Sequence, residues 1–256
     1  PKAGPVRRWI TLRLARDADI VIVTNSADAA TLAAAGIRSQ VIPIGSNIPV
    51  APPPGYTRAA WRDHLGVGSD ELLVAYFGLL SASKGADLLV EACRQAANLR
   101  WRLLIVGGAA TTAQDRAYAD QFQRLLIDAG IAQRVIRTGH VTPAEVSAHL
   151  LAADCVALPF RDGASFRRGS LLAALAHGCP VITTTPTDAD TRSALPAESV
   201  ALTVARNDSA ALADAIARLA NDPELRARLA REGTALAARF SWDSIAAQHE
   251  ACYGRP

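Results

Sequence analysis

A chain of 256 residues that is half hydrophobic and one fifth charged has the composition of a globular protein with one or two domains. Its net charge of +3 is too small to indicate nucleic acid as a partner, and no apolar run approaches the roughly 18 residues of a transmembrane helix. The cysteines and histidines lack metal-ligand spacing, so we expect no metal, no disulfide and a reducing compartment. No secretion signal is visible, and we expect a cytoplasmic protein, with peripheral attachment to a membrane left open.

The first 45 residues contain too few elements to bury a sheet of their own. Helices are expected over 5–16 and 26–35, and strands over 20–24 and 40–44. The run Pro49-Val-Ala-Pro-Pro-Pro54-Gly55 then predicts a stiff connector. We therefore expect residues 1–45 to be the end of a truncated Rossmann-like domain and residues 46–60 to be a linker.

From residue 71 onward, runs rich in Val, Ile and Leu alternate with amphipathic, Ala-rich stretches, as in βαβ units around a parallel sheet. Strands are expected over 72–77, 103–106, 135–138, 154–158, 180–184 and 200–204. Helices are expected over 85–97, 114–129, 143–152 and 168–177, with little helical pattern over 185–199 and a helical tail over 209–253. The sequence predicts an α/β fold with a Rossmann-like doubly wound parallel sheet of order 3-2-1-4-5-6 over residues 61–240, followed by a closing helix over 241–256.

Two loops would flank the point where this strand order reverses, which is where doubly wound sheets bind ligands. They span residues 78–85 and 159–169. In the second loop we expect Arg167 and Arg168 to lie in the first turn of a helix, where the helix dipole disfavours cations. A bound anion would compensate, because free backbone N–H groups and guanidinium donors would converge on it. The alternative is a solvated arginine pair on a surface turn.

Lys84 is the second candidate cation. Only two of the 27 basic residues are lysines, so this chain normally uses arginine for surface charge. A lysine at the end of a Gly- and Ser-containing loop can hold an ammonium over a phosphate that backbone N–H groups already bind. The alternative is a solvated lysine at the start of a helix.

Further candidates lie at the ends of the expected strands, and each has a structural alternative. The glycines would let a ligand approach the backbone, or they form ordinary turns. The serines would bind phosphate, or they cap a helix. The aspartate would accept hydrogen bonds from sugar hydroxyls, or it shapes a turn. A lone histidine at a strand end is more often structural. The expected donor-binding set is Gly78, Ser83, Lys84, Gly85, Gly107, Gly108, His140, Val141, Asp162, Ser165, Arg167, Arg168, Gly169 and Ser170. Neither a G-x-G-x-x-G fingerprint nor a complete P-loop motif is present.

Together these residues make most of the chain resemble the donor-binding half of a retaining GT-B glycosyltransferase of the family-4, or group 1, type. The order and spacing of several motifs carry the resemblance. They lie over 18–26, 41–45, 76–85, 104–107, 153–159, 172–182 and 240–253. The resemblance implies two Rossmann-like domains, of which the N-terminal one, missing here for the most part, supplies the acceptor side.

Two features depart from the family's pattern. Leu79 stands where the family often has arginine. Ser165 and Ala173 stand where it has paired glutamates spaced E-x7-E, so that Asp162 would replace the first glutamate. Arg167 and Arg168 would then replace lost phosphate and ribose contacts, and the donor sugar stays open.

We therefore expect a glycosyltransferase of hexosyltransferase type that uses a nucleotide-diphosphate sugar as substrate and needs no cofactor. Lys84, Arg167 and Arg168 would stabilise the leaving diphosphate, an electrostatic contribution to catalysis. The acceptor is an unknown saccharide, lipid or small molecule, and retention is implied by the resemblance alone. The absent glutamates leave two alternatives open, a non-catalytic nucleotide-binding module and a GT-B sugar-nucleotide epimerase.

Overall fold

A computed structural model describes residues 4–108 and 112–254 of the chain. Its centre is a parallel sheet in which the strand order is β5-β4-β3-β6-β7-β8. Counted along the chain from β3, this is the predicted order 3-2-1-4-5-6, so the expected fold class is confirmed. The strands are β3 (Leu72–Phe77), β4 (Trp101–Val106), β5 (Val135–Arg137), β6 (Cys155–Leu158), β7 (Val181–Thr184) and β8 (Leu202–Val204).

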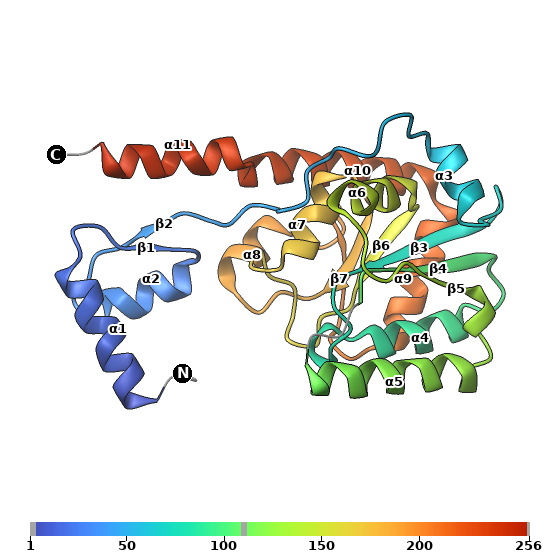
Figure 1. Cartoon of the computed structure of the whole chain (residues 1–256), viewed down its shortest axis with the longest axis horizontal. Helices are drawn as coiled ribbons and strands as arrows, with labels where there is room; N and C mark the ends of the chain where they lie inside the picture. Colours follow the sequence, from blue (N-terminus) through green and yellow to red (C-terminus); the bar gives the residue numbers. More distant parts are fainter. Residues whose placement is uncertain (1–3, 109–111, 255–256) are drawn as a thin grey trace.

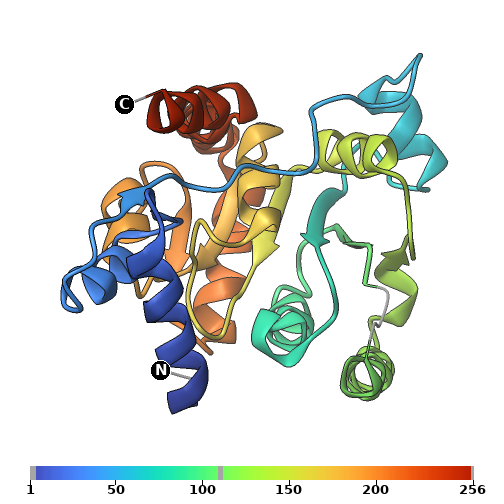
Figure 2. The ribbon, with the colours of Figure 1, turned by 60° about the vertical axis from the view of Figure 1, so that its left-hand side comes forward.

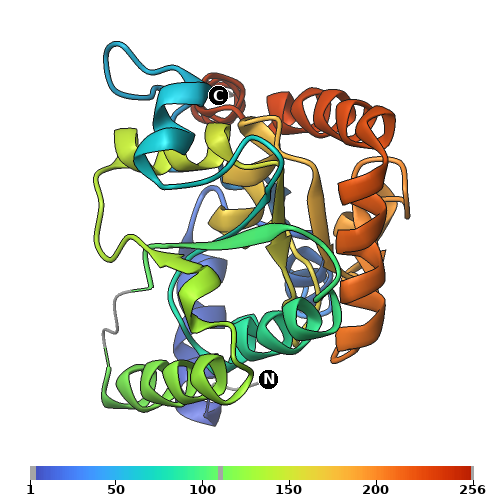
Figure 3. The same cartoon turned by 90° about the vertical axis from the view of Figure 1, so that its right-hand side faces the viewer.

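Helices cover both faces of this sheet, as Figures 1 and 3 show. Because side chains alternate along a strand, Val74 and Tyr76 face one hydrophobic core, whereas Leu73 and Ala75 face the other. The first core is closed by α4 (Ala86–Gln95), α5 (Ala113–Asp128) and α9 (Ser209–Asn221), and the second by α3 (Arg58–His64), α6 (Pro143–Ala152), α7 (Gly169–Ala176) and α8 (Ala189–Ala194). Near-continuous burial of β3, β4, β6 and β7 agrees with a parallel sheet covered on both sides.

The N-terminal unit is small. It consists of α1 (Pro5–Asp17), β1 (Ile22–Val23), α2 (Ser26–Ala33) and β2 (Gln40–Val41). The two strands pair in parallel, and no residue of α1 is buried. In Figure 2 this unit lies beside α8, where the Ser26 backbone N–H donates to the Asp190 carboxylate at 2.7 Å.

An extended connector joins the N-terminal unit to the main sheet, and the C-terminal end of the chain returns to this connector. Two helices, α10 (Pro223–Ala237) and α11 (Trp242–Tyr253), run back along the molecule (Figure 1). Ile245 and Cys252 of α11 pack on Ile42 in a small buried cluster. The Trp242 indole N–H donates to the Ser46 carbonyl at 2.6 Å, so the last helix holds the connector in place.

Three local expectations differ from the structure. Helix α7 begins at Gly169, and Arg168 is its N-cap, so neither Arg167 nor Arg168 lies in its first turn. Short helix α8 occupies a stretch with little helical pattern, and α3 begins within the expected linker. Each begins at a side-chain cap, Thr57 and Asp188 respectively, which a search for hydrophobic periodicity does not detect.

Candidate functional site

The loop after β3 brings Lys84 over the end of the strand. Gly78 has φ +133°, and a Cβ added there would lie 2.6 Å from the Lys84 Nζ, so the ammonium passes directly above this glycine. A short 3-10 turn, η1 (Ala82–Lys84), ends at Gly85 in the left-handed region, and α4 begins immediately after it. The chain thus uses two glycines to fold Lys84 back over the carboxyl end of β3.

The two loops expected to form the site are in direct contact. The Arg161 backbone N–H donates to the Ser83 carbonyl at 3.0 Å, and a Cβ at Gly85 would collide with the Pro159 carbonyl. The Arg161 side chain reinforces this junction through an ion pair with Asp87 of α4. Sequence reasoning missed this role of Arg161, since only the fold brings it to Asp87.

Arg168 is on the loop that contacts the Lys84 loop. Its guanidinium forms an ion pair with Asp162 and lies 4.9 Å from the centre of the Phe160 ring. Burial lowers the pKa of the Lys84 ammonium below its ordinary value, and the positive charge of Arg168 lowers it further. The structure therefore brings Lys84, Arg168 and Asp162 together, with two cations and one carboxylate at the switch point of the sheet.

The first turn of α7 adds backbone donors to these cations. No side chain caps this helix, and the N–H groups of Gly169 and Ser170 have no hydrogen-bond partner among the described residues. Ser170 is buried. The Asn47 side chain of the connector lies beside Gly169, 3.8 Å from where a Cβ would stand. Asn47 was missed by sequence reasoning because it is distant in the chain. Uncapped N–H groups at a helix start can bind an anion.

The carboxyl ends of β4 and β5 form the other side of the switch point. Gly107 pairs with Gly139 in an isolated bridge, and the Gly107 N–H donates to the Thr138 hydroxyl at 3.1 Å. Gly107 and Gly108 both have φ +84°, which brings the backbone close to the strand end. His140 is exposed, whereas Val141 packs against the core.

Arg167 and Ser165 lie apart from this cluster. Arg167 is exposed and, with Ser165, lines a separate cavity of about 610 Å³ beside α8. The Ser165 hydroxyl accepts from the Arg167 backbone N–H at 3.3 Å, which shapes the turn. Consecutive arginines therefore serve different places, Arg168 beside Lys84 and Arg167 in the neighbouring cavity.

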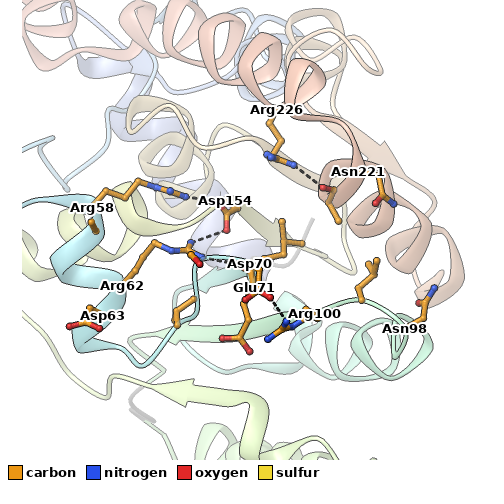
Figure 4. A pocket seen from close by; sticks show the side chains of 16 residues that line it. Arg58, Arg62, Asp63, Asp70, Glu71, Asn98, Arg100, Asp154, Asn221 and Arg226 are labelled. Carbon is orange, nitrogen blue, oxygen red and sulfur yellow. Dashed lines mark hydrogen bonds and ion pairs between the residues drawn. The ribbon is translucent and has the colours of Figure 1, made fainter.

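A cavity of about 840 Å³ lies at the opposite end of the sheet, where the strands begin (Figure 4). Its charged groups are largely paired with one another. Asp154 binds Arg58 and Arg62, and the buried Arg62 guanidinium also donates to the carbonyls of Gly68 and Glu71. Doubly wound sheets bind ligands at the carboxyl ends of their strands, so we assign this cavity a structural role despite its size.

Two further properties concern only residues 4–108 and 112–254. Within them, no group of three or more His, Cys, Asp or Glu side chains is arranged to hold a metal ion. The same residues include no helix that is long and apolar enough to cross a membrane.

Comparison with known proteins identifies the family of this chain. The family model for glycosyl transferases group 1 matches residues 71–222. The D-inositol 3-phosphate glycosyltransferase of Mycobacteroides abscessus is 32% identical over 243 residues, which cover 93% of this chain and 50% of that protein. The chain spans about half the length of the curated relatives that head the comparison.

Solved structures of GT-B glycosyltransferases superpose on most of the chain. Sucrose-phosphate synthase from Thermosynechococcus elongatus gives a TM-score of 0.81 at 27% identity and covers 98% of this chain and 62% of its own. The HepE protein of Anabaena, solved with UDP-glucose, also gives 0.81, at 23% identity, covering 99% of this chain and 69% of its own. The second likeness concerns the fold alone.

Proposed function

This chain belongs to the group 1 glycosyl transferases, and on that premise we propose that it is the donor-binding part of an enzyme that transfers a sugar from a nucleoside-diphosphate sugar. The nucleotide base is left open, so uridine and guanosine diphosphates are both tested. The acceptor side, and with it transfer itself, would require the half of the protein that the longer relatives possess.

The cluster of Lys84, Arg168 and the uncapped start of α7 is the observation that carries this proposal. Both cations are partly buried, and Arg168 is paired with the Asp162 carboxylate. As the bond from the anomeric carbon to the diphosphate oxygen breaks, the electron pair stays on that oxygen. Two nearby cations and two free N–H groups would stabilise the charge that develops there. We propose no cofactor and no metal, because side-chain cations can neutralise the diphosphate.

The remaining donor contacts are assigned by position. The nucleoside would lie against the ends of β4 and β5, where Gly107, Gly108 and the backbone at His140 and Val141 leave room for a ring. Gly78, Ser83 and Gly85 would let the diphosphate approach the backbone beneath Lys84. Retention of the anomeric configuration remains a proposal that rests on the family resemblance.

One observation favours a second candidate, a nucleotide-binding module without catalysis. Ala173, at the place of the family's second glutamate, is fully buried in α7, and Ser165 stands at the place of the first. Neither residue can accept hydrogen bonds from ribose or sugar hydroxyls as a carboxylate does. A module of this kind would bind nucleotide but would not turn over a donor.

Calorimetry of this chain with UDP and GDP tests the donor site. Ala substitutions at Lys84 and Arg168 should each weaken binding by about 1.5–3 kcal/mol, the range for hydrogen bonds to charged groups. Arg231→Ala is a matched control, since Arg231 is an exposed arginine on α10, away from the site. Equal affinity of all four proteins would refute the site. Donor hydrolysis or transfer by the longer protein would then separate the enzyme from the non-catalytic module.

A further inference from the structure

The loop that carries Arg168 contains a further arginine, Arg161, whose side chain bonds to two other elements of the protein. One terminal nitrogen of its guanidinium forms an ion pair with Asp87 in the first turn of α4. The other terminal nitrogen donates to the Asn207 side-chain oxygen at 2.6 Å, in the turn between β8 and α9. The forked shape of a guanidinium allows both contacts at once, so Arg161 joins α4 to the turn before α9.

Asp87 is also held from α5. The Tyr118 hydroxyl donates to the Asp87 carboxylate at 2.7 Å and accepts from the Asp87 backbone N–H at 3.2 Å. Tyr118 binds the Oδ1 atom, whereas Arg161 pairs with the Oδ2 atom, so the two contacts do not compete. The first turn of a helix also favours a carboxylate. We refer to Arg161, Asp87, Tyr118 and Asn207 as the Arg161 network.

Asn207 has a backbone conformation that few residue types adopt. Its φ is +61°, in the left-handed region, and among the described non-glycine residues only Glu198 shares this property. Glycine would suit such a backbone without strain. Asparagine tolerates the left-handed region and also carries a side-chain acceptor, which glycine lacks. The turn after β8 therefore combines a left-handed backbone with an acceptor for Arg161.

The Arg161 network acts where the two donor-site loops meet. The Arg161 backbone N–H donates to the Ser83 carbonyl, one residue before Lys84. The other end of the same loop is fixed separately, because the Ala164 N–H donates to the Thr184 carbonyl at 3.2 Å. Helices α4 and α9, which the network connects, lie side by side on one face of the sheet (Figure 3). The end of the loop that meets Lys84 therefore depends on Arg161.

We propose that Arg161, held by Asp87 and Asn207, is a positioning residue that sets the place of the two donor-site cations relative to each other. A diphosphate binds tightly only if Lys84 and Arg168 reach it together, so a shift of one loop removes a charge-assisted contact. This inference rests on the proposed function. Its structural part, the placement of the loop, can be measured without nucleotide.

The test compares Asn207→Gly with Asn207→Asp. Glycine keeps the left-handed turn but removes the acceptor, whereas aspartate keeps an acceptor for Arg161. In calorimetry, Asn207→Gly should bind UDP and GDP about tenfold more weakly than the parent chain, which is the loss of one charge-assisted hydrogen bond. Asn207→Asp should bind as the parent chain does. Urea unfolding should show no loss of stability in either variant, and hydrogen exchange over residues 159–163 should become faster in Asn207→Gly alone.

Glu198→Gly is the matched control. Glu198 has a φ of +63°, and its exposed side chain pairs with Arg218. It precedes β8, whereas Asn207 follows this strand, so the two turns lie at opposite ends of it. The control makes the same change at a left-handed position and should leave nucleotide affinity and exchange over residues 159–163 unchanged.

The outcomes separate this proposal from the proposed function. If Asn207→Gly binds nucleotide as tightly as the parent chain, the Arg161 network does not position the cations, and the donor site stands without it. A clear loss of stability in Asn207→Gly would assign the network a structural role and overturn the proposal. If the parent chain binds neither nucleotide, the proposed function fails and hydrogen exchange decides: faster exchange in Asn207→Gly supports the placement of the loop by Arg161, and unchanged exchange refutes it.

Discussion

At the scale of single residues, Gly85 shows most directly how the donor site is assembled. It has φ +67°, and its missing Cβ allows the Pro159 carbonyl to pack against the start of α4. A side chain at this position would separate the two loops that carry Lys84 and Arg168. The glycine is therefore required for contact between loops in addition to its left-handed backbone.

Gly85→Ala should destabilise the protein and abolish UDP binding. Gly55→Ala is the matched control, because Gly55 also has a positive φ, +77°, but faces open space. The free energy of unfolding of this control variant should fall only by the roughly 1–2 kcal/mol that an alanine in the left-handed region costs. Urea unfolding and calorimetry measure both effects. Equal losses of stability in the two variants, with UDP binding retained in Gly85→Ala, would contradict the loop contact.

Lys84 should cost stability in the absence of ligand. The pKa of Lys84 is lowered in the folded chain, so the unfolded chain binds the Lys84 proton more tightly. At neutral pH this difference lowers the free energy of unfolding. The loss of stability becomes smaller as the pH rises above the lowered pKa. Lys84→Met should therefore leave the unfolding free energy equal or slightly higher while UDP binding is lost. Denaturation at pH 7 and calorimetry check this. A clear drop in stability would show that Lys84 is mainly structural.

At the residue scale, the scarcity of a residue type can be seen in the sequence, whereas the pairing of side chains cannot. Lys84 attracted attention as a rare lysine, and the structure places it at the switch point. The split between Arg167 and Arg168 was not predictable, because it follows from an ion pair with Asp162 and from a helix that starts one residue later. Side-chain partners depend on the folded chain, and local pattern does not specify them.

At the scale of elements, Asp154 joins β3, α3 and the start of β6. Its carboxylate accepts from the Leu73 N–H of β3 at 2.7 Å and pairs with Arg62 of α3 at 2.9 Å, at the start of β6. Asp154→Ala should lower the unfolding free energy by about 3–5 kcal/mol, because the buried Arg62 charge loses its partner. Asp70→Ala, which removes the exposed partner of Arg100 in the same cavity, should cost at most about 1 kcal/mol. Similar costs for both, measured by urea unfolding, would mean that Arg62 is satisfied by backbone carbonyls alone.

The contact between α3 and α6 should make the fold sensitive to acid. The Trp61 indole donates to His149 Nδ1 at 3.0 Å, and burial lowers the pKa of His149 to about 4. An unfolded histidine titrates near 6.5, so stability from this site is complete above that pH and is lost as pH falls from 6.5 towards 4. His149→Gln keeps an acceptor for Trp61 without a titrating group and should flatten this part of the pH–stability curve. An unchanged slope would assign the acid sensitivity to other groups, such as the buried His177.

The elements themselves were largely predictable. Strands of the main sheet are buried on both faces, so they appear as short runs of Val, Ile and Leu, and their alternation with amphipathic helices predicts the sheet order. Helices α3 and α8 have seven and six residues and depend on caps and on packing against other elements, so no periodic pattern marks them. Helix α11 was expected as the closing helix, but its packing on Ile42 depends on the fold and could not be predicted.

At the scale of the whole molecule, the N-terminal unit has too few elements to cover its own two strands. Two parallel strands and α2 shield few residues, and α1 exposes Val6, Trp9, Ile10 and Leu14. Parallel sheets normally have both faces covered, so a two-stranded one needs further strands and helices. The relatives are about twice as long as the stretch that matches them, and we expect the extra length to complete this layer.

A longer protein, extended before Pro1 to the length of its relatives, should transfer sugar, whereas this chain should only bind donor. The acceptor side of the cleft would be closed by the completed layer, and exclusion of water would strengthen the field of Lys84 and Arg168 on the leaving diphosphate. UDP affinity should be similar in both proteins. Turnover of a donor with a crude acceptor extract should be measurable only in the longer one.

Trp9→Glu provides the structural control for this division of labour. In the present chain Trp9 is 61% exposed, so the substitution should change stability by less than about 0.5 kcal/mol. In the longer protein it should cost several times more, because the same side chain would be buried by the completed layer. If the two proteins turn over donor equally, the catalytic machinery lies within the residues of this chain. If Trp9→Glu has the same small effect on the stability of both proteins, α1 is a free surface helix.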